Sequence, residues 1–361
     1  MRTEIQERLL VQSMTAVRIH EHGGPEVLKV ERVPVPEPGP GEVLVRVRAT
    51  SASWWDAGYR KGAVRPRPGA SALRLPFQLG REAAGEVAAL GPGAGRFAVG
   101  ARVVVMTCPA CGRCASCRRG LDNLCLDTEL PAHQRFGGYA EYVTVPEHGL
   151  LPSPGGVDDE TLACVLWSYG TVLHMVNARA RVQPGDSVLV TGASGGMGTA
   201  SLQLSRLAGA GLVIALSGAP EKAEALRAAG ADVVVDRRAP DAAEQVRAHT
   251  GGAGVDVVLD NVGGPMLPLA VEAAGLGARI VLAAVMGGRT AELAIGDVFR
   301  KHLDILGTRA ATRREQEQVL AFAASGRIAP VIGARYPLAE ARRAHEALDA
   351  GEHVGKIVLL P

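Results

Sequence analysis

The residues Val190-Thr-Gly192-Ala-Ser-Gly195-Gly196-Met-Gly198 stand between an apolar run, Ser187 to Thr191, and a helical pattern that continues from Met197 to Leu207. Glycines 192, 195 and 198 permit a tight turn, a close approach of backbone to a pyrophosphate and close packing of the following helix. The N-terminus of that helix offers amide donors and the positive end of the helix dipole. This arrangement predicts a dinucleotide-binding site; the alternative is a tight strand-to-helix turn without a ligand.

The end of the next predicted strand indicates which dinucleotide binds. A site for NAD is expected to place an acidic residue about 20 positions further on, where it binds the ribose 2′-hydroxyl. Here that place holds Leu216-Ser217-Gly218, with no acid, and Lys222 follows. A carboxylate would repel a 2′-phosphate, whereas a hydroxyl and a cation would bind it. The sequence therefore favours NADP(H) over NAD(H); the alternative for Lys222 is an exposed place in the first helical turn.

The wider pattern predicts an α/β fold with two domains. From Met14 to about Leu151, short alternating strands are separated by Gly and Pro, which is typical of a β-barrel or sandwich. After Asp186, apolar runs alternate with helical segments, as in a doubly wound parallel sheet. A tail from about Thr308 is expected to rejoin the first domain. The apolar runs are Leu212–Leu216, Asp232–Val235, Val255–Asp260 and Ala278–Ala283.

Four cysteines predict a structural zinc site. Cys111, Cys114, Cys117 and Cys125 form the pattern C-x2-C-x2-C-x7-C. Four thiolates at such spacing close a tetrahedral site with no open position, which is the chemistry of structural zinc. Unbound thiols or disulfides are the alternative, and Cys108 is either a free thiol or a spare ligand. Five of the six cysteines lie between positions 108 and 125, which fits a metal better than a secreted disulfide scaffold.

Composition narrows the class of partner. The chain has 361 residues, a formal net charge of +2 and 47% hydrophobic residues. Such a small net charge does not indicate binding to nucleic acid or to an anionic membrane. No apolar run approaches the roughly 18 residues that span a bilayer. Residues 1–13 lack the features of a signal peptide, so we expect a cytoplasmic protein. We interpret this segment as an N-terminal extension: a loose arm, a misassigned start, or an arm that stabilises a dimer.

Taken together, these motifs resemble the medium-chain dehydrogenase/reductase superfamily, which includes zinc alcohol dehydrogenases and zinc-free quinone and enoyl reductases. Further matching segments are Gly80-Arg-Glu-Ala-Ala-Gly-Glu-Val87, Gly137-Gly-Tyr-Ala-Glu-Tyr142, Asp260-Asn-Val-Gly-Gly264, Tyr336-Pro-Leu-Ala-Glu340 and Gly355-Lys-Ile-Val-Leu359. The resemblance implies a GroES-like β-barrel domain at 14–166 and 310–361, with the zinc lobe at 108–126. It also implies a Rossmann domain at 167–309, a small-molecule substrate in the cleft, and a homodimer or a tetramer.

The resemblance also implies a set of cofactor contacts. Thr171 would pack on the nicotinamide, and the backbone of Thr308 and Ala310 would bind the carboxamide. Arg60 would contact a cofactor phosphate or brace its loop, and His174 is expected to be a satisfied buried histidine. The expected cofactor-binding residues are Thr171, Gly192, Ser194, Gly195, Gly196, Met197, Gly198, Ser217, Lys222, Asn261, Ala284, Thr308 and Ala310.

The chain departs from the zinc dehydrogenases at their catalytic zinc. The resemblance places Ser53 at the first ligand position, Arg81 at the second and Trp167 at the third. A neutral alcohol, a cation and an indole are poor zinc ligands. We therefore expect one structural zinc per chain and no catalytic zinc.

Without a Lewis acid, reduction of an activated double bond is easier than interconversion of an alcohol and a ketone. Hydride would reach the β-carbon of an enone, enoyl thioester or quinone, and negative charge would move to the carbonyl oxygen. Arg81 would either stabilise that oxygen or bind an acidic group of the substrate, or it would fill the vacated metal position and pair with Glu82 or Asp56; one arginine could do both. Tyr59 or Ser53 would supply the proton; the alternative is water, which often serves in related reductases.

The three tryptophans predict the shape of the substrate. Trp54 and Trp55 adjoin the first lost ligand position and Trp167 occupies the third, in a chain with only 4% aromatic residues. An aromatic wall favours a flat, apolar substrate, with Asp56 and Glu82 also expected at the pocket. We expect an NADPH-dependent reductase; the alternatives are reduction of an imine or iminium, and a catalytically silent NADPH-binding protein.

Overall fold

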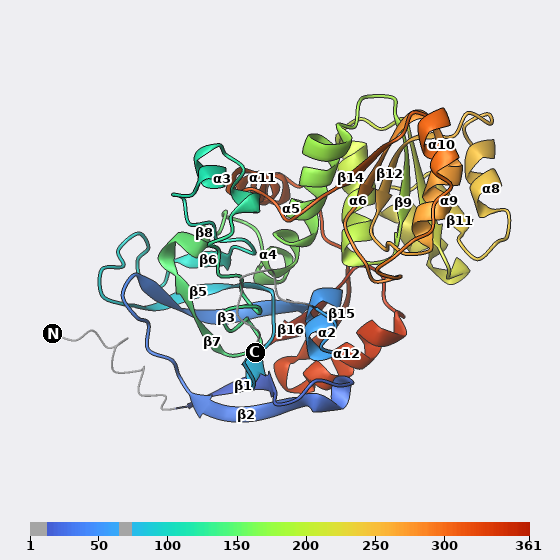
Figure 1. Ribbon diagram of the computed structural model, residues 1–361. Coiled ribbons are helices and arrows are strands. Elements are labelled where there is room, and N and C mark those ends of the chain that lie inside the picture. Colours follow the sequence, from blue (N-terminus) through green and yellow to red (C-terminus); the bar gives the residue numbers. More distant parts are fainter. Residues whose placement is uncertain (1–12, 65–73) are drawn as a thin grey trace. The chain divides into compact units, whose positions relative to one another are not determined.

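The computed structural model describes residues 13–64 and 74–361. The chain divides into two compact units (Figure 1), one formed by residues 1–167, 312–325 and 332–361 and the other by residues 168–311 and 326–331. Of the predicted extension at 1–13, Ser13 alone is described, as the first residue of a strand. No helix in the described part of the chain combines the length and hydropathy needed to cross a membrane.

The first unit contains two sheets. Within its described residues, a seven-stranded sheet has the order β15-β16-β3-β5-β6-β8 with β7 paired to β3, and a three-stranded sheet has the order β2-β1-β4. The strands are β1 (Ser13–Ile19), β2 (Leu28–Pro34), β3 (Glu42–Ala52), β4 (Phe77–Gln78), β5 (Glu82–Leu90), β6 (Arg102–Val105), β7 (Tyr142–Pro146), β8 (Leu150–Pro152), β15 (Ile332–Pro337) and β16 (Lys356–Leu360). The helices are α2 (Trp54–Arg60), α3 (Ala115–Arg118), α4 (Asp159–Val165), α11 (Arg313–Ala324) and α12 (Ala341–Ala350).

Strand β3 organises this unit because it pairs with β5 and β7 and also with β16 from the C-terminal end of the chain. Val43, Val45 and Val47 alternate along β3 and are buried in one apolar cluster, as the two-residue period of a strand requires. At its other end, Ala52 pairs antiparallel with Ile357 of β16. The C-terminal segment therefore completes the sheet that carries β5, on which the candidate site is built.

The second unit is built on a parallel sheet. Its described strands have the order β11-β10-β9-β12-β13-β14, and every neighbouring pair is parallel. This order confirms the doubly wound sheet predicted from the sequence. The strands are β9 (Ser187–Thr191), β10 (Leu212–Ser217), β11 (Val233–Asp236), β12 (Val255–Asp260), β13 (Ala274–Leu282) and β14 (Asp304–Gly307). The helices are α5 (Ser168–Leu173), the π-helical segment η4 (His174–Ala180), α6 (Gly196–Leu207), α7 (Ala223–Ala228), α8 (Ala242–Ala248), α9 (Met266–Ala273) and α10 (Ile295–Arg300).

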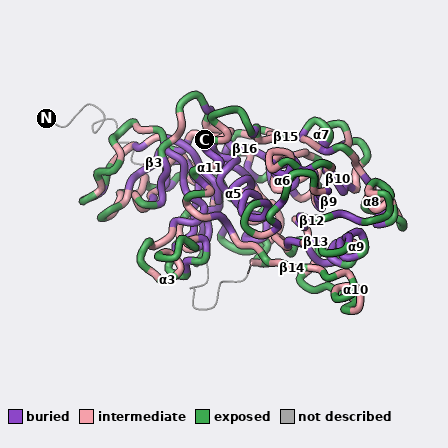
Figure 2. Tube along the Cα trace, turned by 90° about the horizontal axis from the view of Figure 1, so that it is seen from above, coloured by how far each residue is buried: buried purple, intermediate pink, exposed green. Residues whose placement is uncertain are grey.

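The central strands of the parallel sheet are buried along their length (Figure 2), because helices cover the sheet. Leu189 of β9 and Val258 of β12 share one apolar cluster with Val246 of α8 and Ala270 of α9. In this strand order the direction of winding reverses beside β9. Ligands of such sheets bind at that point, at the carboxyl ends of the strands.

Candidate functional site

The glycine-rich turn after β9 has the geometry that its sequence predicts. Gly192 has φ of +60°, and a Cβ on Gly198 would lie 2.1 Å from the carbonyl oxygen of Gly192, so the start of α6 packs directly on the turn. A Cβ on Gly195 would meet only that same oxygen, at 3.6 Å. The backbone at Gly195 is therefore open to a close ligand, beside the first turn of a twelve-residue helix.

Three predicted cofactor-binding side chains of the second unit each bury a polar atom that no hydrogen bond satisfies among the described residues. These atoms are Thr171 Oγ1, Asn261 Oδ1 and Thr308 Oγ1. The amide nitrogen of Asn261 donates to the Thr191 carbonyl and to Ser201 Oγ, both at 3.2 Å, which fixes its side chain. An unsatisfied buried polar atom costs about 1–3 kcal/mol. A nicotinamide with its carboxamide is a ligand that fits such a set.

The remaining predicted cofactor residues lie in the same unit. Ser194 is in the turn and Met197 is in the first turn of α6, beside Gly196. Ala284 follows β13, and its carbonyl oxygen would lie 2.4 Å from a Cβ on Gly263. Ala310 has φ of +47°, and His174 is buried in η4, as expected.

The carboxyl ends of β10 and β11 bring Ser217 next to an arginine that the sequence analysis missed. The Arg237 amide donates to the Ser217 carbonyl at 2.9 Å, and Arg237 Nε would lie 2.8 Å from a Cβ on Gly218. The neighbouring carboxylate, Asp236, accepts hydrogen bonds from Arg238, which lowers its pKa. The signal was available, because Arg237-Arg238 directly follows a predicted strand.

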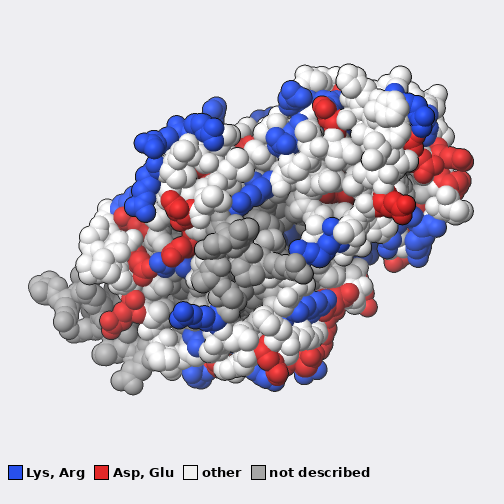
Figure 3. Space-filling model, viewed as in Figure 1, with Lys and Arg blue, Asp and Glu red and all other residues white. Residues whose placement is uncertain are grey.

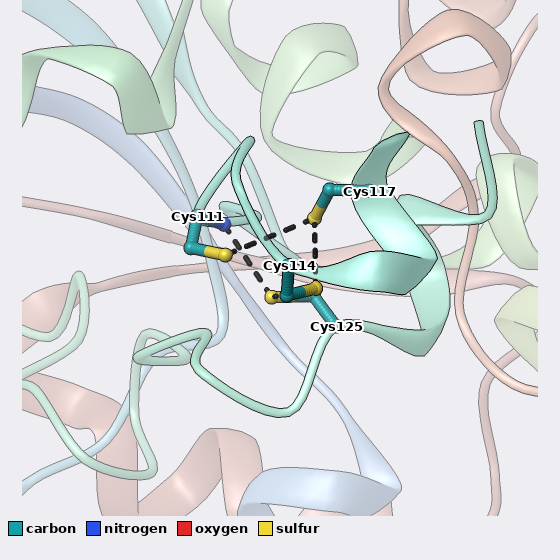
Figure 4. Close-up of side chains that lie close together, drawn as sticks. All are labelled: Cys111, Cys114, Cys117 and Cys125. Carbon is teal, nitrogen blue, oxygen red and sulfur yellow. Dashed lines mark hydrogen bonds between the residues drawn. The ribbon is translucent and has the colours of Figure 1, made fainter. Parts of the chain in front are cut away.

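The four predicted zinc ligands converge (Figure 4), and their sulfur atoms all lie within 4.8 Å of one another. The Sγ atoms of Cys114 and Cys117 are 3.5 Å apart, and those of Cys111 and Cys117 are 3.9 Å apart. Four sulfurs at about 2.3 Å from one zinc ion would be about 3.8 Å apart. A disulfide would need about 2.05 Å. The spacing therefore fits a tetrahedral metal site.

This lobe is also where basic side chains gather (Figure 3). Arg113, Arg118 and Arg119 are exposed around α3. Among the described side chains, the cysteine cluster is the one group of three or more His, Cys, Asp or Glu that could hold a metal ion. Cys108 is buried outside it.

Arg81 lies at the centre of a second cluster, in the first unit. Its guanidinium is 1% exposed, and its carbon atom Cζ lies 4.5 Å from the ring centroid of Trp167 and 5.1 Å from that of Trp55. Nη1 donates to the Pro131 carbonyl at 3.2 Å and Nη2 to the Thr107 carbonyl at 2.9 Å, while Nε has no partner among the described residues. Burial lowers the pKa of Arg81.

The expected ion pairs of Arg81 with Asp56 or Glu82 do not form. Asp56 is fully buried, and its carboxylate accepts from the amides of Gly80, at 2.9 Å, and Arg81, at 3.2 Å. Ser53 caps α2, exchanging hydrogen bonds with Asp56. Arg81 therefore makes no direct ion pair with either carboxylate, because both are hydrogen-bonded to other donors, although both raise its pKa electrostatically. Burial raises the pKa of Asp56.

Glu82 belongs to a separate buried network. Its carboxylate pairs with Lys356 of β16 and accepts from Ser51 Oγ at 3.0 Å and from the Trp167 amide at 2.9 Å. Although burial opposes the charge of Lys356, the Glu82 carboxylate holds its pKa above the usual value. Glu82 thus fixes the backbone of Trp167, whose indole covers Arg81.

The aromatic residues separate into two places. Trp55 and Trp167 are 5.4 Å apart between ring centroids, and Tyr59 lies edge-on to Trp55 at 5.4 Å. Trp54 is 38% exposed beside Lys61 and makes no ring contact with the other described tryptophans. The structure therefore brings together two of the three predicted wall residues.

Two further residues of α2 contact histidines. Tyr59 forms a hydrogen bond with Nδ1 of His133, which the sequence analysis did not single out. Arg60 is fully buried, donates to His345 Nδ1 at 3.0 Å and pairs with Asp349. These bonds favour the bracing role for Arg60 over a phosphate contact.

Comparison with known proteins identifies the family. Residues 39–155 match the alcohol dehydrogenase GroES-like domain, and residues 196–325 match the zinc-binding dehydrogenase family. The chain is 30% identical to an acryloyl-coenzyme A reductase of Metallosphaera sedula, over 95% of this chain and 98% of that protein. The chain belongs to the medium-chain dehydrogenase/reductase superfamily.

Other members of the superfamily are similar over nearly the whole chain. A quinone oxidoreductase of Rattus norvegicus is 29% identical, over 96% of this chain and 98% of that protein. A solved NAD-dependent alcohol dehydrogenase is 38% identical, with a TM-score of 0.89, and covers 96% of this chain and 100% of its own. The predicted GroES-like and Rossmann architecture is therefore confirmed, and the chain is similar to oxidoreductases of more than one reaction.

Proposed function

We propose that this member of the superfamily is an NADPH-dependent reductase of activated, conjugated C=C bonds in flat, apolar substrates, without catalytic zinc. The observation that carries the proposal is Arg81: a buried guanidinium without a carboxylate ion pair among the described residues, lying against two indoles. Its position matches the second zinc ligand of the zinc dehydrogenases. A cation there favours negative charge on a substrate oxygen.

The chain's own residues supply charge stabilisation and orientation. Bound NADPH supplies the hydride that reaches the β-carbon of the substrate. Arg81 stabilises the enolate oxygen electrostatically, and its unpartnered Nε is the donor left for it. The rings of Trp55 and Trp167 both contact the guanidinium, and they offer apolar faces to a planar substrate.

The preference for NADPH rests on the end of β10. Arg237 lies at this strand end, and Lys222, which is buried rather than exposed, follows it in η5 (Pro220–Lys222). These two cations would bind the ribose 2′-phosphate together with the Ser217 hydroxyl, which now donates to the Ala219 carbonyl at 3.3 Å. The carboxylate that ends β11, Asp236, is compensated by Arg238. One similar structure is an NAD-dependent alcohol dehydrogenase. We attribute the different preference proposed here to these basic residues.

We further propose one structural zinc per chain, held by Cys111, Cys114, Cys117 and Cys125, and a homodimer. The zinc fixes the lobe around α3 and takes no part in the reaction. The dimer forms through β14, an edge strand of the parallel sheet with an open row of backbone donors and acceptors. Phe299 and Ile295 of α10 are exposed apolar side chains of the same unit, and we assign them to the same interface.

Oxidation of NADPH and of NADH, followed at 340 nm, tests the proposal with enones, enoyl thioesters, quinones, cyclic imines and simple alcohols. We expect turnover of enones or quinones with NADPH and none of simple alcohols. Turnover of imines alone would favour the imine reductase. NADPH binding without turnover of any acceptor would favour a silent cofactor-binding protein. Robust alcohol oxidation would overturn the account of the site.

A further inference from the structure

The cluster around Arg81 contains a polar pair that joins Tyr59, a proton donor suggested by the sequence, to a histidine that the sequence did not indicate. Tyr59 of α2 and His133 form a hydrogen bond through Nδ1, with their ring centroids 5.1 Å apart. Both are buried, at 2% and 5% exposure. Tyr59 also packs edge-on against Trp55, the indole that lies on Arg81. The pair is thus one aromatic ring away from the buried cation.

One tight turn holds both the histidine and an anchor of the cation. The Leu130 carbonyl accepts from the amides of His133, at 3.2 Å, and Gln134, at 3.1 Å. Ala132, just before His133, has φ of +49°, a conformation that costs an alanine about 1 kcal/mol or more. This turn directs the Pro131 carbonyl to Arg81 and the His133 imidazole to Tyr59. The groups around the cation are therefore fixed relative to one another.

A second tyrosine–histidine pair in the same unit shows what a purely structural version looks like. The Tyr139 hydroxyl forms a hydrogen bond with His345 Nε2 at 2.9 Å, but His345 also accepts a hydrogen bond from Arg60. The charge of Arg60 is compensated by Asp349. That imidazole is occupied on both nitrogens, and its arginine has a counter-ion. Arg81 forms no ion pair with a described carboxylate, and the Trp55 ring lies against both Arg81 and Tyr59. A nearby cation favours the anionic form of a hydroxyl group.

We propose that Tyr59 is the proton donor to the α-carbon and that His133 orients it and returns the proton. The inference rests on the proposed function. Hydride adds an electron pair at the β-carbon, and the electrons of the C=C bond move to form the enolate. The α-carbon then forms a C–H bond with the Tyr59 hydroxyl proton, leaving a phenolate beside Arg81. A proton from water passes through the His133 imidazole to the Tyr59 oxygen.

Two acceptors separate proton delivery from hydride transfer. 2-Methylcyclohex-2-enone must be protonated at carbon, which is slow from water. 9,10-Phenanthrenequinone is protonated at oxygen, which is fast. We expect Tyr59→Phe to lower kcat for the enone about 10²-fold or more, as for loss of a general acid, and to lower quinone turnover much less. The enantiomeric excess of 2-methylcyclohexanone should fall, because water replaces a fixed donor.

The variants of His133 separate orientation from proton return. Asparagine can reproduce the hydrogen bond of Nδ1 but cannot take up a proton and pass it on. His133→Asn should therefore retain the enantiomeric excess of the product while kcat for the enone falls. His133→Leu should lose both. The matched control is Tyr139→Phe, which removes the same hydroxyl from the structural pair and should leave the enone-to-quinone ratio and the enantiomeric excess unchanged.

The outcomes are distinguishable. If the unaltered enzyme reduces neither acceptor, the proposed function fails. If it reduces the enone, but Tyr59→Phe lowers both activities equally and leaves the enantiomeric excess unchanged, Tyr59 is a packing residue and this inference fails alone. If His133→Leu behaves as the unaltered enzyme, the role of His133 is overturned.

Discussion

Arg81 Cζ lies 4.5 Å from the ring centroid of Trp167, a residue that follows it by more than eighty positions in the chain. The Glu82 carboxylate holds the Trp167 amide at 2.9 Å and thereby fixes this relationship. We propose that the two residues stand at the second and third zinc-ligand positions of the zinc dehydrogenases. The contact with the indole and the two hydrogen bonds to backbone carbonyls offset the cost of burying the Arg81 cation.

Replacement of Arg81 tests its charge. Arg81→Leu should lower kcat/KM for enones about 10²- to 10³-fold, as when one donor to a developing oxyanion is removed. It should also destabilise the fold by about 1–3 kcal/mol, because the carbonyls of Thr107 and Pro131 lose their donor. Arg81→Lys keeps the charge and is the matched control. Steady-state kinetics and urea denaturation measure both effects; equal loss in the two variants would contradict the electrostatic role.

The cofactor preference depends on Arg237 and Lys222. Lys222→Ala combined with Arg237→Ser should weaken NADPH binding about 10- to 100-fold, because each removed cation loses a charge-assisted hydrogen bond to the 2′-phosphate. NADH binding should change little. Arg227→Ala removes an exposed arginine of α7 away from the strand end and serves as the control. Fluorescence titration with both nucleotides measures the ratio, and a ratio that stays constant would refute the assignment.

The cysteine lobe should hold one zinc ion per chain. Cys117→Ser should abolish zinc binding and lower the melting temperature, because the other three thiolates no longer close a tetrahedral site. Cys108→Ser and Cys164→Ser alter cysteines outside the cluster and should keep the metal. Plasma emission spectrometry gives the zinc content. Two zinc ions per chain would contradict the proposed active site.

His345 should make the fold less stable in acid. Burial lowers its pKa from 6.5 to about 3. Between these two pKa values the unfolded chain binds one proton more than the folded chain. The contribution of His345 to the free energy of unfolding is therefore fully present above pH 6.5 and is lost as the pH falls below it. The loss approaches about 1.4 kcal/mol per pH unit. His345→Gln, which does not titrate, should show a shallower dependence in urea denaturation from neutral pH downward. Equal slopes would exclude His345 as the source.

The proposed dimer should depend on the surface beside β14. Phe299 and Ile295 are 71% and 76% exposed. Replacing both by glutamate should convert the dimer to a monomer of 37.5 kDa, because charged side chains oppose burial of that face. Leu126, 75% exposed in the zinc lobe, gives the control Leu126→Glu. Light scattering reports the mass, and a dimer that persists in the double variant would place the interface elsewhere.

The sequence by itself determined the parallel sheet, its glycine turn and the convergence of the four cysteines. These features are local: a turn of seven residues and a cysteine cluster within a fifteen-residue segment can each be recognised without knowing what else packs on them. The departures from the zinc-ligand pattern at Ser53, Arg81 and Trp167 could be recognised from the sequence for the same reason, because each is a single residue within a known motif.

Only the tertiary structure decided what those residues do. The hydrogen-bond partners of Arg81 are the backbone carbonyls of Thr107 and Pro131. Every residue has such a carbonyl, so the sequence does not indicate which ones bind Arg81. His133 reaches Tyr59 from 74 positions away through a turn at Ala132. Trp54 differs from Trp55 only in which side of α2 it occupies, and packing turned one to solvent and the other onto the cation. Long-range contacts of this kind depend on register and burial, which adjacent residues do not specify.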